Sequence, residues 1–255
     1  MYRSRIIPCL LLKDFGLYKT VQFKKPRYLG DPMNTLSLFN GKEVDEIVVL
    51  DISATISGKE PNFEYIRRIT GECFMPMCYG GGVTNLKQVE ALFKLGVEKV
   101  SFNTSLHEKP ELISEAAKNF GSQSIIASID VKKGLFGSYH VNTHSGTKNI
   151  KTDPVEYAKR AVDLGAGEIM LTSIDHEGMM NGYDYELIKK VSSAVNIPVV
   201  SNGGAGNLGD CVKAINAGAS AAAAASIFVY YGPLNAVLIS YPTQAEMKEA
   251  FKVTI

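Results

Sequence analysis

The chain has 255 residues, and its 27 lysines and arginines nearly balance 26 aspartates and glutamates, which leaves a formal net charge of +1. A net charge this close to zero produces no overall electrostatic field that would favour binding to nucleic acid or a membrane. We therefore expect small molecules or another protein as partners. We expect one domain over residues 1–255, since single α/β domains of this length are common.

The cysteines and histidines show no spacing typical of a metal site. No C-x-x-C pair occurs, so we expect no metal, no cofactor and no disulfide framework, in a protein of the reducing cytoplasm. We expect the cysteines to be small buried side chains. The residues concerned are Cys9, Cys73, Cys78, Cys211, His107, His140, His144 and His176. The apolar run at residues 6–12 is too short to cross a membrane.

Eight short apolar runs alternate with longer segments of helical periodicity. This alternation is typical of parallel strands that are each followed by a covering helix, and the runs lack polar alternation because both faces of such strands are covered. We expect strands at residues 5–12, 46–53, 75–79, 98–103, 124–130, 168–174, 197–202 and 220–225. The helices between them end on glycines such as Gly96, Gly165 and Gly218.

The chain also repeats itself at an offset of about half its length. Residues 75–82 correspond to residues 197–204 at an offset of 122, and residues 6–13 correspond to residues 125–132 at an offset of 119. Such a repeat favours a closed (β/α)8 barrel over an open doubly wound sheet, and the length agrees with about 250 residues for that fold. The two homologous half-barrels are expected at about residues 1–122 and 123–255.

Two segments interrupt the alternation of apolar runs and helical segments, residues 14–31 and residues 132–153. Each follows the first strand of its half and is rich in glycine, lysine or proline. We predict that both are long loops at the carboxyl ends of the strands, where barrels hold their active sites. They are therefore candidate substrate lids.

Glycine runs follow the third and seventh strands, at residues 80–82 and 203–206, and each leads toward a helix that Asn85 or Asn207 can cap. Bare backbone N–H groups and a helix amino terminus favour a bound phosphate, although a tight turn also explains such glycines. Two equivalent runs favour two phosphate pockets, and hence a substrate that is anionic at both ends. The residues at the ends of the next strands that can complete each pocket are Asn103, Thr104, Ala225 and Ser226.

Asp130 ends the fifth strand, where a carboxylate faces the barrel mouth and can act as a general acid or base. A structural, hydrogen-bonded aspartate is the alternative. Asp51 ends the second strand, while Asp175 and Glu177 follow the sixth. These carboxylates can orient Lys19 or bind substrate hydroxyls, and capping or a loop salt bridge is equally open for Asp175 and Glu177.

Four charged residues stand instead at the starts of strands, and so at the opposite end of the barrel. The simplest interpretation is a ring of ion pairs that closes the barrel floor. Because burying such a ring opposes stability, a second explanation is also needed. The four residues are Arg5, Glu46, Lys99 and Glu168.

These patterns occur within RIIPCL, FNGKEVDEIVVLDISA, YGGGVTNLKQVEALFKLGVEKVSFNTS, FGSQSIIASID, LGAGEIMLTSIDHEG and SNGGAGNL. Together the six segments resemble the cyclase subunit of imidazole glycerol phosphate synthase, over nearly the whole chain to about residue 228. The resemblance implies a (β/α)8 subunit whose amino-terminal face binds a glutaminase. It also implies that ammonia passes through the barrel to a bisphosphorylated ribonucleotide at the carboxyl-terminal face.

The resemblance also implies a role for individual residues. Asp130 matches one of the family's two catalytic aspartates, and the four charged residues at the strand starts match a salt-bridged gate at the ammonia entrance. The residues expected to bind substrate or its phosphates are Lys19, Asp51, Gly82, Asn103, Thr104, Thr172, Glu177, Gly178, Gly204, Ala225 and Ser226.

The chain departs from this family pattern at the mouth of the expected barrel. Leu11 replaces the other catalytic aspartate, and an aliphatic side chain cannot accept or give a proton. Thr20, Glu177 and Met179 differ as well. The PCLLLK start, the FKKPRYLGDPMN segment and the tail after residue 228 resemble cyclase-like subunits encoded with surface-polysaccharide genes.

That resemblance implies a partner glutaminase and an ATP-dependent N-sugar amidotransferase, which turns an acetamido sugar into an acetamidino sugar. We therefore expect a subunit that delivers ammonia for sugar amidination. Two alternatives stay open: a working cyclase of histidine biosynthesis, and a non-catalytic scaffold that activates the glutaminase.

Overall fold

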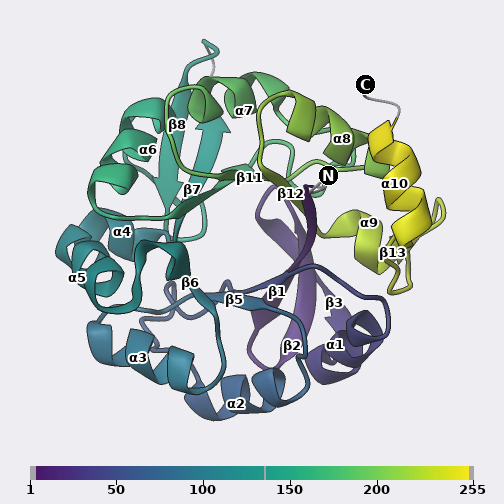
Figure 1. Ribbon diagram of the computed structural model, residues 1–255, viewed down its shortest axis with the longest axis horizontal. Helices are drawn as coiled ribbons and strands as arrows, with labels where there is room; N and C mark the ends of the chain where they lie inside the picture. Colours follow the sequence, from purple (N-terminus) through teal and green to yellow (C-terminus); the bar gives the residue numbers. More distant parts are fainter. Residues whose placement is uncertain (1–3, 135, 253–255) are drawn as a thin grey trace.

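The computed structural model describes residues 4–134 and 136–252. Eight parallel strands follow one another around a closed ring, because each strand pairs with the next and the last pairs with the first. Figure 1 looks down this ring, with the helices outside it. The predicted (β/α)8 barrel is confirmed. The barrel strands are β1 (Arg5–Lys13), β4 (Ile47–Asp51), β5 (Met77–Gly80), β6 (Lys99–Phe102), β7 (Ile125–Lys133), β10 (Glu168–Ser173), β11 (Val199–Asn202) and β12 (Ala221–Ala224).

Six of the described helices begin where an asparagine or aspartate side chain caps them. Asn85 accepts a hydrogen bond from the backbone N–H of Gln88, and Asn207 accepts one from that of Asp210, both at 3.1 Å, so the two predicted caps are confirmed. The helices are α1 (Pro32–Asn40), α2 (Phe63–Gly71), α3 (Leu86–Lys94), α4 (Thr104–Glu108), α5 (Pro110–Phe120), α6 (Pro154–Asp163), α7 (Tyr185–Ser192), α8 (Leu208–Asn216), α9 (Ser226–Val229) and α10 (Gln244–Lys252). None of the described helices is long and apolar enough to cross a membrane.

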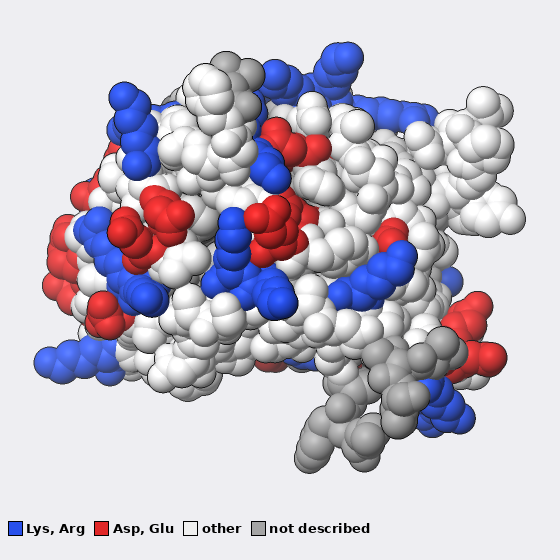
Figure 2. Space-filling model, turned by 90° about the horizontal axis from the view of Figure 1, so that it is seen from above, with Lys and Arg blue, Asp and Glu red and all other residues white. Residues whose placement is uncertain are grey.

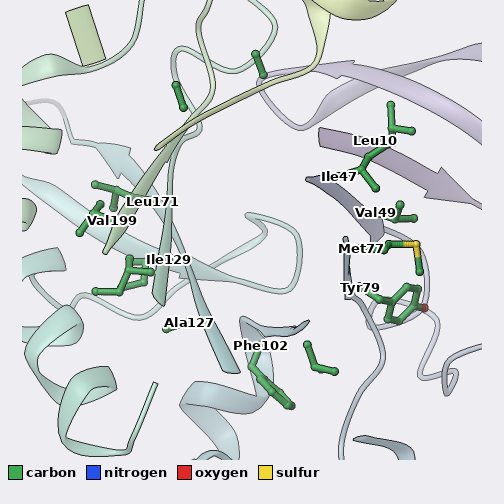
Figure 3. Close-up of a cluster of buried hydrophobic side chains, with 14 of the residues drawn as sticks. Leu10, Ile47, Val49, Met77, Tyr79, Phe102, Ala127, Ile129, Leu171 and Val199 are labelled. Carbon is green, nitrogen blue, oxygen red and sulfur yellow. The ribbon is translucent and has the colours of Figure 1, made fainter. Parts of the chain in front are cut away.

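Apolar side chains form two shells, one on each face of the barrel strands. The outer shell packs between strands and helices, and Figure 3 shows Leu10, Ile47 and Val49 lying together on the neighbouring strands β1 and β4. The inner shell fills the barrel, and its buried members are Ile7, Cys9, Val48, Cys78, Ile126, Met170, Val200, Ala221 and Ala223. Covered faces on both sides explain why the strands read as continuous apolar runs.

The prediction of long loops at residues 14–31 and 132–153 is wrong. The first segment forms β2 (Gly16–Val21) and β3 (Lys24–Gly30), and the second forms β8 (Tyr139–Thr143) and β9 (Lys148–Asn149). β1 and β7 run on past the barrel and pair with β2 and β8 as antiparallel hairpins. Aromatic and β-branched residues in these segments supply the strand preference that their glycines, lysines and prolines obscured.

Three of the four cysteines are buried as predicted, and Cys73 is only half-buried. All four are free thiols. After α9 the chain forms a small hairpin of β13 (Tyr230–Tyr231) and β14 (Ala236–Val237), and then returns through α10. The division into half-barrels near residue 122 stays a prediction.

Candidate active site and charged ring

A cavity of about 450 Å³ opens at the carboxyl ends of the barrel strands. Its wall contains Asp130 and each of the eleven residues that the sequence assigns to substrate or phosphate binding. Residues from all eight strand ends and from β2 meet there, because the ends of parallel strands lie on one rim. The structure therefore brings together one site from positions spread between Lys19 and Ser226.

Asp130 is buried in this wall, and Asn103 Nδ2 donates to its Oδ2 over 3.2 Å. Burial raises the pKa of Asp130 to about 7, a hydrogen bond from Thr172 opposes the rise, and the negative charge of Glu177 adds to it. A carboxyl group with a pKa near neutrality can hold or release a proton under ordinary conditions. Asp130 is thus suited to acid–base chemistry.

In the first half of the chain, the position that corresponds to Asp130 in the repeat is Leu11, and the cavity wall there is apolar. Leu11 lies on β1 in register with Leu50 of β4, and both line the cavity beside Cys9. Burial raises the pKa of the Cys9 thiol to about 12, so this thiol stays protonated. The aliphatic side chain of Leu11 itself supplies no group that can transfer a proton.

Two further carboxylates line the cavity, and both are engaged. Asp51 Oδ1 accepts hydrogen bonds from the backbone N–H and the hydroxyl of Ser53, each at 2.8 Å, and from the N–H of Ala54 at 3.0 Å. Asp51 therefore caps the turn after β4. Glu177 forms a buried ion pair with Lys19.

The pair of Lys19 and Glu177 belongs to a larger set of contacts between the first hairpin and the loop after β10. Glu177 Oε2 also accepts from the Thr20 hydroxyl and from the N–H of Phe23, each at 3.1 Å. A side chain at Gly178 would place its Cβ 2.5 Å from the carbonyl oxygen of Thr20. The hairpin therefore forms a wall of the cavity, and Glu177 makes a loop salt bridge with Lys19 that also orients the Lys19 ammonium group.

Asp175 serves the other hairpin, since its Oδ2 accepts from the N–H of Lys133 at 2.7 Å. Its role is structural, and Asp175 does not line the cavity.

Both glycine turns border the cavity. Gly82 has φ 72° and Gly204 has φ 122°, which L side chains rarely adopt. A Cβ at Gly82 would lie 2.7 Å from the carbonyl oxygen of Lys59, and one at Gly204 would collide with the carbonyl oxygen of Gly182. Tight turns thus require these glycines, and the same turns expose backbone to the cavity.

Two short helices, α4 after Asn103 and α9 after Ala225, start without a side chain that caps their backbone N–H groups. Thr104 and Ser226, the first residues of these helices, both line the cavity. Uncapped N–H groups at a helix start favour an anion, and the two places are equivalent in the repeat.

At the opposite end of the barrel, the four charged residues form the predicted ring. Arg5 pairs with both Glu46 and Glu168. Lys99 Nζ lies 2.8 Å from Glu46 Oε1 and 2.9 Å from Glu168 Oε2, so two cations alternate with two anions. Burial opposes the charge on Lys99, but the two glutamates outweigh it and raise its pKa. Both glutamates are buried, whereas both cations are partly exposed.

Sequence reasoning missed several cavity residues that the two hairpins contribute, among them Phe23, Ser145 and Thr147. Only a correct strand prediction for those segments would have found them. Asn202 was missed as well, although it ends the seventh strand. Its Nδ2 donates to the Thr172 hydroxyl over 3.1 Å. Within the described residues, no three side chains of His, Cys, Asp or Glu are grouped as a metal site.

Comparisons with known proteins agree with this architecture. The family model described as "Histidine biosynthesis protein" matches residues 5–235. The chain is 49% identical over 243 residues to the "Putative imidazole glycerol phosphate synthase subunit hisF2" of Pseudomonas aeruginosa, covering 95% of this chain and 97% of the relative. It is 46% identical over 255 residues to the subunit named hisF3 of Vibrio vulnificus, covering 99% and 98%.

The match to imidazole glycerol phosphate synthase subunit HisF of Chlorobaculum tepidum is shorter. It has 43% identity over 229 residues and covers 89% of this chain and 91% of the relative. The hisF2 and hisF3 relatives thus share more of this chain than the relative from Chlorobaculum tepidum does.

Proposed function

Since this chain belongs to the histidine biosynthesis family, together with HisF subunits of imidazole glycerol phosphate synthase, we propose that it partners a glutaminase and delivers ammonia for the amidination of an acetamido sugar. The glutaminase docks on the amino-terminal face, beside the ring of Arg5, Glu46, Lys99 and Glu168. Ammonia passes the ring, moves along the barrel interior and reaches the cavity. A separate ATP-dependent enzyme of surface-polysaccharide synthesis holds the sugar.

One observation carries this proposal: the charged ring is complete, while the wall at Leu11 is apolar. A ring of four buried or half-buried charges is expensive to hold together for stability alone, so a functional role at the floor accounts for it. Ring closure by the family's route needs two carboxylates, and a missing acid or base removes about 10²- to 10⁴-fold of rate. Delivery of ammonia needs the charged ring and the barrel interior, but it does not need the catalytic aspartate that Leu11 replaces.

The barrel interior suits a small neutral molecule. Between the ring and the cavity lie the inner apolar side chains, including Ile7, Val48 and Met170. A charged ammonium ion is disfavoured in such surroundings, so neutral ammonia is the species that the interior accepts. Neutral ammonia is also the nucleophile that amidination requires, since its nitrogen displaces the acetamido oxygen after ATP has activated that oxygen.

We propose the surface-polysaccharide branch because of the tail after residue 228, the PCLLLK start and the FKKPRYLGDPMN segment. The relatives named hisF2 and hisF3 match 95% and 99% of this chain, whereas the subunit of Chlorobaculum tepidum matches 89%.

In the cavity we propose that Gly82, Asn103 and Thr104 bind one anionic group and that the equivalent residues of the second half bind another. The residues of that second half are Gly204, Ala225 and Ser226. Lys19, Asp51, Thr172, Glu177 and Gly178 shape the wall between the two ends.

A working cyclase of histidine biosynthesis is the second candidate, and Asp130 with its pKa about 7 favours it together with the two glycine turns. Incubating the purified chain with the bisphosphorylated ribonucleotide and an ammonium salt separates the two functions, because free ammonia removes the need for a glutaminase. We expect turnover at least about 10²-fold below that of a subunit with both aspartates. Turnover at the normal rate would overturn the proposal.

The glutaminase arm is tested by adding the partner subunit and glutamine. We expect the chain to stimulate glutamine hydrolysis and Lys99→Met to weaken that stimulation, because the variant leaves two buried glutamates with only Arg5. Lys94→Met is the matched control, since Lys94 is an exposed lysine that pairs only with Glu90 on the outside of α3. Equal effects of the two variants would argue against a role for the ring.

A further inference from the structure

The β13–β14 hairpin is an exposed apolar projection. Every residue from 231 to 238 is exposed, and no charged residue occurs between 226 and 245. Leu234 at its tip is 88% exposed, and Tyr231, Val237 and Leu238 are exposed with it. Contiguous apolar surface of this kind marks an interaction site on soluble proteins, because water is otherwise left in contact with it.

The hairpin stands beside the mouth of the cavity. β12 ends at Ala224, α9 follows at once, and β13 begins at Tyr230. The guanidinium of Arg27 on β3 lies 5.3 Å from the centre of the Tyr230 ring. β3 pairs with β2, and β2 carries Lys19 of the cavity wall. The hairpin and the cavity wall are thus neighbours through one cation–π contact.

Basic residues border this projection. Lys24, Lys25 and Arg27 are exposed on β3, and the aromatic ring of Tyr28 is exposed between them and the strand end. Figure 2 shows Lys and Arg side chains along the upper edge, next to an uncharged lobe on the side where Figure 1 places β13. The nearby carboxylate of Asp31 caps α1. A partner with an apolar patch and an acidic border complements this surface.

We infer that the β13–β14 hairpin and the basic residues of β3 form the docking surface for the ammonia-accepting enzyme, which closes over the cavity mouth. The inference rests on the proposed function. Ammonia that escapes into bulk water becomes protonated and loses its nucleophilic lone pair, so the acceptor must seal the exit. The hairpin lies at that exit, whereas the glutaminase is assigned to the opposite face.

A second copy of this chain fits the surface less well. A symmetric dimer sets the same patch against itself, so Lys24, Lys25 and Arg27 would approach their own copies. Like charges facing each other across an interface are unfavourable. An acidic protein partner removes that repulsion, which is why the observations favour a different protein.

The test uses the purified chain together with a glutaminase and an ATP-dependent N-sugar amidotransferase, the two partners of the proposed function. Sugar amidination is measured with glutamine and, separately, with ammonium salt. Leu234→Glu places a charge within the apolar contact, so we expect glutamine-driven amidination to fall about tenfold or more. The ammonium-driven rate and the stimulation of glutamine hydrolysis should not change, which shows that the variant is folded. Asn119→Glu on α5, on the far side of the barrel in Figure 1, is the control for added charge.

A second variant tests the basic border. Lys24→Glu with Lys25→Glu should lower glutamine-driven amidination in a salt-dependent way, since exposed charges are screened by salt. Unchanged coupling in both hairpin and border variants would overturn the inference and leave the proposed function standing. Failure of the unmodified chain to couple glutamine to amidination would overturn both.

Two other possible partners of this surface, a second copy of the chain and a lipid membrane, would give different results with Leu234→Glu. If the isolated chain is a dimer that Leu234→Glu dissociates, the surface joins two copies. If the chain sediments with vesicles of phosphatidylcholine and phosphatidylglycerol, and the variant does not, the surface binds lipid. Either result would overturn the assignment to the acceptor enzyme.

Discussion

Lys19 and Glu177 form an ion pair inside the cavity wall, and both side chains are less than a tenth exposed. The pair joins β2 to the loop after β10, which are 158 residues apart in the chain. The pair therefore joins the first hairpin to the loop that carries Gly178, and it also holds the Lys19 ammonium group that the resemblance assigns to substrate.

Breaking this pair should destabilise the fold. Glu177→Gln leaves the Lys19 charge buried without a counter-ion, and we expect the free energy of unfolding to fall by about 3 kcal/mol. Chemical denaturation of the purified variant measures the change. Glu90→Gln is the matched control, because Glu90 pairs with Lys94 on the exposed surface of α3 and its loss should have no measurable effect. A small loss for Glu177→Gln would show that the hairpin is held by its backbone contacts.

Stability should depend on pH through Asp130. Its folded pKa of about 7 lies above the unfolded value near 3.9, so the folded state holds the proton more tightly. Stability from this group is present below pH about 4 and is lost as the pH rises through about 7, by at most about 4 kcal/mol. Asp130→Asn should therefore be more stable than the unmodified chain at pH 8, and the two should converge toward pH 4.

The measurement is the free energy of unfolding against pH, with Asp163→Asn as the control. Asp163 is an exposed residue at the end of α6, so its variant should follow the unmodified chain at every pH. An Asp130→Asn curve parallel to that of the unmodified chain would contradict the buried-carboxyl account.

Restoring an acid at position 11 should not restore full cyclase activity. Leu11→Asp puts a carboxyl group beside Leu50 and Cys9, while Glu177 still holds Lys19 and Met179 still stands at the mouth. The assay is ribonucleotide turnover with ammonium salt. In Leu11→Asn the new side chain has nearly the same shape as in Leu11→Asp but cannot act as an acid. A higher turnover rate for Leu11→Asp than for Leu11→Asn therefore measures proton transfer. Full recovery would show that the cavity stayed adapted to ring closure.

The glycine turns should not tolerate a side chain. Gly82→Ala forces a Cβ toward the Lys59 carbonyl at a φ of 72°, and we expect a loss of about 1–3 kcal/mol in the free energy of unfolding. It should also weaken binding of inorganic phosphate if the turn holds an anion. Gly71→Ala, at the end of α2 with open space around it, is the control. Denaturation and calorimetric titration separate the two effects.

Much of this structure could be predicted from the sequence, because the informative residues sit at strand ends. In a parallel barrel every strand end lies on one rim, so Asp51, Asn103 and Asp130 had to converge once the eight strands were recognised. The starts of the strands converge on the other rim, which placed the ring of Arg5, Lys99 and their two glutamates. The observed strand bounds differ from the expected ones by a few residues, for example Met77–Gly80 against 75–79.

What the sequence did not supply was the antiparallel pairing at the mouth. β2 and β8 are strands because β1 and β7 extend beyond the barrel and offer them an edge, and that edge depends on tertiary structure. The ion pair of Lys19 and Glu177 follows from the same pairing. The sequence therefore predicts which of these residues lie at the mouth but not which role each of them has.

The segment that follows the exposed hairpin contacts the first barrel strand. It leaves the mouth after β14, and at Tyr241 its hydroxyl donates to the carbonyl oxygen of Ile6 over 2.7 Å, in a buried contact. Ile6 is the neighbour of Arg5 on the strand where the barrel closes against β12. The exposed hairpin is thus connected, through Tyr241 on the outside of the β1–β12 pairing, to the residue next to the charged ring. This connection between the two ends of the barrel does not pass through its interior.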